Sequence, residues 1–185
     1  MSHRQWILTF GLAALASRSA VLRAGDLLPR GNQAFKEGRF EEAATIYESE
    51  EEGTDLLTRR FNSGVSWARA GAPEQAIERF EDVSARADGE LRASALYNAG
   101  HSAFGKGTAL AVEAASIQEP EEKTKKLAEA ATAFRSSTQF FRAVEPPDEA
   151  TTRNIAAAKT ALRAVVDEIA RIEAEKRRKE EDDAL

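Results

Sequence analysis

The sequence contains no cysteine, which excludes a disulfide bond and a thiolate metal site. Proline occurs only five times in 185 residues, and aromatic residues make up 7% of the chain, most of them phenylalanine. The remainder is rich in alanine and charged side chains, a composition that favours close-packed helices over a sheet. The net charge of −5 gives no reason to expect nucleic-acid binding, which usually requires a basic face. The length suffices for one domain with a core.

The first two dozen residues differ from the rest of the chain. His3 and Arg4 precede an apolar run of 11 residues at positions 6–16, and the Ala-Leu-Ala of residues 14–16 offers a cleavage site. These features are typical of a secretory signal peptide. The run is shorter than the roughly 20 apolar residues of a transmembrane helix. We therefore interpret residues 1–24 as a leader that directs export, with an uncleaved membrane anchor and an ordinary buried helix as alternatives.

A self-similarity with a period of 33 residues is the most informative feature of the sequence. Gly31 and Gly38 return as Gly64 and Gly71, each 33 positions later, and a third copy begins near Gly100. Repeats of this length, built from two short helices, are typical of a solenoid in which each unit buries its face against the next.

The pattern from Asp26 onward predicts helices throughout, because no window alternates with period two. Glycines and prolines divide it into helices at about 25–37, from 40, 55–70, from 73, 90–104, 121–144 and 148–172, the last capped by Asp148. After Gly107 a turn and a second helix should follow, but residues 108–117 intervene and are interpreted as an inserted turn or two plus a loop. Residues 173–185 have no apolar face and are expected to fray.

The residues at the repeated positions resemble tetratricopeptide repeats, helix pairs with small residues at set positions and an aromatic residue near the end of the second helix. The resemblance implies an all-α solenoid of about three hairpins, with an insertion in the third and a long C-terminal helix. A small residue lets neighbouring backbones approach, and the ring fills the gap; the third unit pairs Gly100 with Phe134. The repeat signature consists of Gly31, Gly38, Ala43, Tyr47, Gly64, Gly71, Ala76, Phe80, Gly100, Gly107, Ala130 and Phe134.

Within this superfamily, the order of elements is similar to the exported repeat proteins of bacterial aerotolerance (Bat) gene clusters, the BatC-like group. The similarity rests on the leader, the run from Ala95 to Gly100, the insertion, the Pro146-Pro147 break, and Arg153-Asn154 leading a long charged helix. It implies a location in the periplasm or on a periplasm-facing membrane. The implied partners are von Willebrand factor A-type membrane proteins and a MoxR-type ATPase system.

Repeat geometry predicts a concave groove lined by the first helix of each unit. Asn62, Asn98 and Asn154 could hold a peptide backbone through their amide groups, or could instead cap contacts between repeats. Leu28 and Phe61 stand where carboxylate-clamping repeats carry lysine, which disfavours binding to a chaperone C-terminus. The residues that we call the predicted groove are Leu28, Asn32, Phe35, Lys36, Phe61, Asn62, Val65, Arg69, Tyr97, Asn98, His101 and Phe104.

Four other features give weaker indications. Residues 100–107 resemble a phosphate-binding loop but lack the hydroxyl residue after the lysine and a preceding strand. His101 is the only histidine beyond the leader, too few for a zinc site. The acidic stretches 48–52 and 119–122 lack EF-hand spacing and are interpreted as solvated surface rather than a calcium site. The basic run 176–179 is interpreted as a solvated helix end rather than a contact with anionic lipid or an acidic partner.

The sequence therefore predicts a non-catalytic scaffold that binds a partner peptide or helix through the predicted groove, in the cell envelope that the resemblance implies. No catalytic, cofactor-binding or metal-binding residue is predicted, and no nucleic-acid partner. The alternative is a structural subunit of a larger membrane-associated complex, contacting its neighbours through the insertion and the C-terminal helix.

Overall fold

Seven helices make up the part of the chain that the structure, a computed structural model, describes: residues 27–49 and 53–184. No strand occurs in these residues, so the prediction of an all-helical fold is confirmed. The predicted leader, residues 1–24, lies outside them. The helices are α1 (Leu27–Lys36), α2 (Phe40–Glu48), α3 (Leu56–Arg69), α4 (Pro73–Arg86), α5 (Gly89–Ser116), α6 (Pro120–Arg142) and α7 (Glu149–Asp183).

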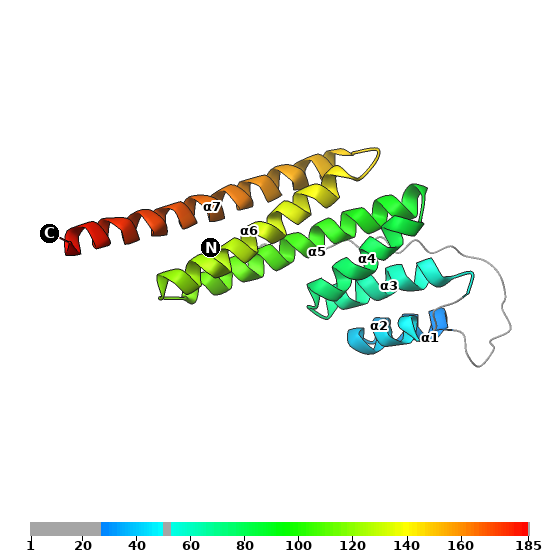
Figure 1. The fold of residues 1–185 in the computed structure, drawn as a ribbon. Helices are drawn as coiled ribbons and strands as arrows, with labels where there is room; N and C mark the ends of the chain where they lie inside the picture. The colour runs from blue at the N-terminus through cyan, green and yellow to red at the C-terminus, as the bar shows by residue number, and fades with distance from the viewer. Residues whose placement is uncertain (1–26, 50–52, 185) are drawn as a thin grey trace, which may run out of the picture.

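Successive helices pack against each other in the order of the sequence. Each helix from α1 to α6 contacts the next one extensively, and helices two apart make only small contacts. Figure 1 shows the resulting row, with α1 and α2 at one end and α7 at the other. Each helix is therefore buried mainly between its two neighbours in the chain.

Gly38 and Gly71 end α1 and α3 in the same way. Their φ angles are 77° and 79°, in the left-handed region that glycine adopts without steric cost. The Arg39 N–H donates to the Ala34 carbonyl at 3.0 Å, and the equivalent bond 33 residues later has the same length. This hydrogen bond closes a Schellman C-cap. The predicted helix ends at both glycines are confirmed.

A helical glycine lies directly against an aromatic ring in each of the first two hairpins. The ring of Tyr47 in α2 covers Gly31 of α1, and the ring of Phe80 in α4 covers Gly64 of α3. A Cβ atom at position 64 would lie 2.8 Å from Cε1 of Phe80, closer than side-chain carbons approach each other. Close contact between helices is therefore what requires glycine at these two positions.

The third hairpin departs from the prediction of a turn and a loop. α5 continues through Gly107 to Ser116, so residues 108–116 extend this helix and Gly107 does not end it. Gly107 lies under the ring of Phe134, where a Cβ would be 2.8 Å from the ring. The residues after it are rich in alanine, which favours helix. Gly107 is thus a packing position, unlike Gly38 and Gly71.

The longer α5 also changes the partner of Gly100. The sequence predicts Phe134 at this place, but the ring against Gly100 is that of Phe141 in α6. The two glycine–ring pairs are seven residues apart on both helices, which run in opposite directions, so the same contact occurs twice. Ser137 lies four residues before Phe141, as Ala76 lies four residues before Phe80, and it is buried in the same way. Its hydroxyl donates a hydrogen bond to the Gly100 carbonyl at 2.9 Å.

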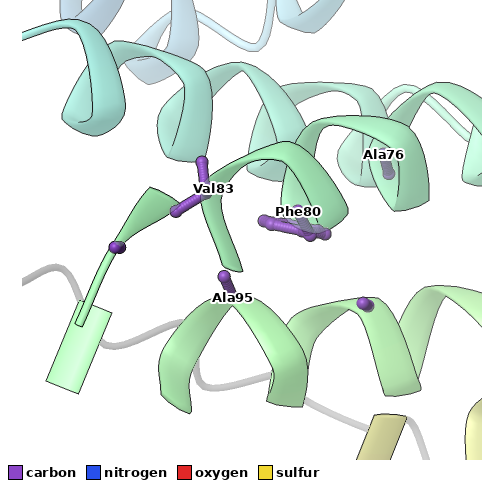
Figure 2. Close-up of a cluster of buried hydrophobic side chains, with 6 residues drawn as sticks. Ala76, Phe80, Val83 and Ala95 are labelled. Carbon is purple, nitrogen blue, oxygen red and sulfur yellow. The ribbon is translucent and has the colours of Figure 1, made fainter. Parts of the chain in front are cut away.

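The core is a series of small clusters between neighbouring helices. One lies between α1 and α2, one among α3, α4 and α5, and one among α5, α6 and α7. Figure 2 shows the middle cluster, in which Ala76, Phe80 and Val83 of α4 lie above Ala95 of α5. All four side chains are fully buried. Stability is therefore distributed along the row of helices.

Replacing Ala76 with leucine is expected to destabilise the protein by about 1–3 kcal/mol. Ala76 is fully buried in the same cluster as Phe80, so added methylene groups must displace the ring or a neighbouring helix. Thermal melting, monitored by circular dichroism, measures the loss of stability. Ala85→Leu, at an exposed position of the same helix, is the matched control. An unchanged melting temperature in Ala76→Leu would contradict close packing here.

α7 extends further than predicted. Asp148 caps its start as predicted, with Oδ1 accepting the Thr151 N–H at 2.6 Å. The helix continues to Asp183, where the sequence predicts a frayed end from residue 173. Most of these terminal residues are alanine, glutamate, lysine or arginine, which favour helix without a buried face. Lys176 also pairs with Glu121 of α6 at 2.6 Å.

Candidate functional site

The predicted groove residues lie on α1, α3 and α5, the first helix of each hairpin. Within each helix most are three or four positions apart, so they share one face. α1 carries Leu28, Asn32, Phe35 and Lys36; α3 carries Phe61, Asn62, Val65 and Arg69; α5 carries Tyr97, Asn98, His101 and Phe104.

At the α1 end, predicted groove residues contact side chains of α2. The guanidinium of Arg69 lies over the rings of Phe35 and Phe40, 5.9 and 5.0 Å from their centroids. Asn32 Oδ1 accepts the hydroxyl of Tyr47 at 2.7 Å. Burial raises the pKa of Tyr47 to about 12, so this hydroxyl remains a donor well above neutral pH. Arg69 is exposed and places a positive charge on this face.

At the α5 end, Tyr97 and His101 contact α6 and α7. Their rings and that of Phe141 pack edge to face, with centroids 4.6 to 5.7 Å apart. Nδ2 of Asn154 in α7 lies 3.2 Å from the Tyr97 hydroxyl oxygen and 3.2 Å from His101 Nε2. Asn154 thus joins α7 to α5, which favours contact capping over peptide binding at this position.

His101 is expected to make stability depend on pH. Burial lowers the pKa of its imidazole below the usual 6.5, so the unfolded chain takes up a proton at a higher pH than the folded chain. Its contribution should be complete above about pH 6.5 and decline below it, by at most about 1.4 kcal/mol per pH unit. Urea unfolding at about pH 7 and about pH 5.5 measures this, and His101→Gln should remove it. The same decline in both proteins would assign it to other groups.

Glu48 is the centre of a polar cluster that the sequence does not reveal. Its Oε1 accepts hydrogen bonds from Trp67 Nε1 at 2.9 Å, from Arg79 Nε at 2.7 Å and from the Ser63 hydroxyl. Burial alone would raise the pKa of the Glu48 carboxyl, but these bonds outweigh burial and hold the pKa below its usual value. The interpretation of Glu48 as solvated is therefore wrong, because it joins α2 to α3 and α4. Residues 50–52 lie outside the described part of the chain.

The other segments singled out in the sequence lie within helices or at their ends. Residues 100–107 lie inside α5, so they do not form a turn between a strand and a helix. Residues 119–122 and 176–179 are all exposed, as expected for solvated segments, and Lys176 and Glu121 form an ion pair at the surface. Among residues 27–49 and 53–184, no three carboxylate or imidazole groups are arranged to hold a metal ion.

A cleft of about 580 Å³ opens between α4 and α6, over α5, which packs against both. We call it the acidic cleft. It shares no residue with the predicted groove, and sequence reasoning missed it because three helices must meet to form it. Its charged lining is Glu74, Glu78, Glu81, Lys106 and Glu129, and its larger apolar lining is Ile77, Leu110 and Phe140.

Comparison with protein-family models, curated proteins and solved structures found no match to this chain. None of the described helices combines the length and the apolar character needed to span a bilayer. The function of this protein is therefore inferred from its own residues and their geometry.

Proposed function

We propose that the chain is a tetratricopeptide-type solenoid that acts as a non-catalytic scaffold for protein–protein interaction. The observation that carries this proposal is the repeated glycine–ring contact: Gly31 with Tyr47, and Gly64 with Phe80, 33 residues later. Helix pairs that pack mainly on their neighbours in the chain leave long exposed faces. Proteins built in this way use those faces chiefly to bind partners.

The face formed by α1, α3 and α5 supports partner binding best. Lys36 and Arg69 are exposed on it, and Asn62 and Asn98 are half-buried. Cations and amides suit a peptide or helix that offers carboxylates and backbone carbonyls. Because Asn154 already contacts Tyr97 and His101, we place the partner segment across α1 and α3 and next to Asn98 of α5.

Binding through this face is tested by removing its amides. Tagged wild type and the double variant Asn62→Ala/Asn98→Ala are used to capture partners after mild cross-linking in cells. Gln75→Ala/Gln139→Ala, which removes two exposed amides from α4 and α6, is the matched control. We expect a partner that the asparagine variant loses at least about tenfold and the control retains. Equal recovery with all three proteins, at equal melting temperatures, would rule out this face.

For location and partner, we propose export and a von Willebrand factor A-type membrane protein, on the resemblance to the BatC-like group. Mass spectrometry of the N-terminus of the protein isolated from cells tests export. Cleavage at the Ala-Leu-Ala of residues 14–16 should leave Ser17 as the first residue. An N-terminus at Met1 in a membrane fraction would indicate a retained anchor, and one in a soluble cytosolic fraction would contradict export.

A structural subunit of a larger membrane-associated complex is the alternative. It is favoured by the extended end of α5, where Val112 is 68% exposed, and by the charged end of α7 beyond Ile172. Co-purification in mild detergent separates the two functions. A stoichiometric assembly favours the subunit, and a weak, salt-sensitive partner favours the scaffold.

A further inference from the structure

Two walls of the acidic cleft each run along a helix, α4 and α6. α4 lines it with four residues from Glu74 to Glu81, at positions i, i+3, i+4 and i+7 of one helix face. At roughly 1.5 Å per residue this wall is about 10 Å long, and the α6 wall from Glu129 to Phe140 is about 16 Å long. Walls of this length suit a helix of about two to three turns lying along them.

The floor of the acidic cleft is mainly apolar, with two hydroxyl side chains, Thr132 and Ser136, on the α6 side. Ile77 of α4, Leu110 of α5 and Phe140 of α6 are half-buried, while Ala103 of α5 and Ala133 of α6 are buried and small. Small side chains among larger ones leave a hollow of about 580 Å³. A hollow of this size receives several apolar side chains of a ligand.

The rim of the acidic cleft is negatively charged. Four glutamates and one lysine line it, a net charge of −3 from four carboxylates and one ammonium group. Three of the carboxylates have basic neighbours, but those carboxylates are 44% to 68% exposed, and exposed pairs of this kind are weak. The pairs are Glu74–Lys106 at 2.9 Å, Glu78–Arg79 at 3.0 Å and Glu129–Lys126 at 3.4 Å.

We propose that the acidic cleft binds a basic amphipathic helix of a partner protein. The apolar stripe of such a helix covers the floor, and its lysines or arginines meet the rim carboxylates, as in other complexes in which a helix lies in a groove. This surface shares no residue with the predicted groove. Binding at the acidic cleft can therefore be tested independently of the function proposed above.

Lys106 offers a test of this proposal that needs no charge reversal. Lys106 lines the cleft and its ammonium group pairs with Glu74 of α4, so it competes with an incoming cation for this carboxylate. Replacing it with glutamine frees the carboxylate and removes a repulsive charge. A basic helix that lies in the cleft should therefore bind the Lys106→Gln variant more tightly than the wild type.

The probe is a fluorescein-labelled synthetic peptide of about 14 residues, designed from leucine and lysine as an amphipathic helix about 20 Å long. A scrambled peptide of the same composition and a leucine–glutamate peptide are the peptide controls. Binding is measured by fluorescence anisotropy at about 0.1 M salt, where exposed charges beyond about 10 Å are screened. The protein variants are Glu78→Lys/Glu81→Lys, Lys106→Gln and, as a control with the same change in net charge, Asp167→Lys/Glu173→Lys on exposed positions of α7.

The proposal expects the Glu78→Lys/Glu81→Lys variant to weaken binding at least about tenfold and Lys106→Gln to tighten it about threefold, with the α7 control within about twofold of wild type. Equal affinity for the scrambled peptide, or equal weakening by the α7 control, would overturn it in favour of non-specific attraction.

Displacement of the peptide by spermine at a similar concentration would instead indicate a site for small polycations. Self-association in sedimentation, abolished by the charge reversal, would indicate a second copy of the chain as the occupant. If the charge reversal impairs folding, tighter binding by Lys106→Gln, with unchanged binding by Lys159→Gln at an exposed position of α7, still decides the question.

Discussion

Replacing Phe80 with alanine is expected to lower the free energy of unfolding by about 3–5 kcal/mol, the loss typical of a buried phenylalanine. Phe80 is fully buried, lies edge to face with Phe61 at 5.6 Å, and belongs to the cluster shared by α3, α4 and α5. The substitution leaves a cavity where these three helices meet. Urea denaturation measures the change. Val112→Ala, at a 68% exposed position, should change stability by less than about 0.5 kcal/mol.

The loss of the Phe80 ring should also reverse the effect of a substitution at Gly64. In the wild type, Gly64→Ala places a methyl group 2.8 Å from the ring and should destabilise the protein. In the Phe80→Ala background the same alanine should stabilise α3 by up to about 1 kcal/mol, because alanine favours helix over glycine. The double-mutant cycle should give a coupling of about 1–3 kcal/mol. Additive effects would show that the ring is not the reason for glycine at position 64.

Leucine at Gly100 and leucine at Gly105 should have opposite effects within one helix. At Gly100 the first added carbon would already lie 2.7 Å from Cδ1 of Phe141, so overpacking should cost about 3 kcal/mol. At Gly105 an added Cβ meets nothing within 4 Å, and replacing glycine in an exposed helix should stabilise by about 0.5–1 kcal/mol.

Chemical denaturation of the two variants, under the same conditions, measures this difference. The helix propensity gained is the same at both positions, so the difference isolates the contact with α6. If both variants were stabilised, the close approach of α5 and α6 at Gly100 would be disproved, and with it the revised pairing of Gly100 with Phe141.

α5 connects the two proposed binding surfaces. Tyr97 and His101 lie on the face shared with α1 and α3, whereas Ala103 and Lys106 lie in the acidic cleft. Gly100 lies against Phe141 of α6, which fixes how α5 is rotated. Substitutions at Gly100 are therefore expected to disturb both surfaces, while Lys106→Gln and the Asn62/Asn98 pair each address only one.

The sequence by itself determined the local features of this protein. Gly38 and Gly71 end helices because their φ angles are in the left-handed region, and Asp148 starts α7 because its side chain accepts a backbone N–H three residues ahead. These features need only a few neighbouring residues, and so does the periodicity that places each set of predicted groove residues on one helix face. The pairing of glycine with ring in the first two hairpins followed from the 33-residue spacing.

Only the tertiary structure decided the features that depend on how helices meet. The same residue type ends a helix at Gly71, where φ is 79°, and lies in the middle of one at Gly107, against the ring of Phe134 from α6. Glu48 joins residues 15 to 31 positions away, and Asn154 reaches His101 across 53 positions. The acidic cleft needs α4, α5 and α6 together. Such contacts are set by close packing of surfaces distant in the chain, which no local pattern of residues encodes.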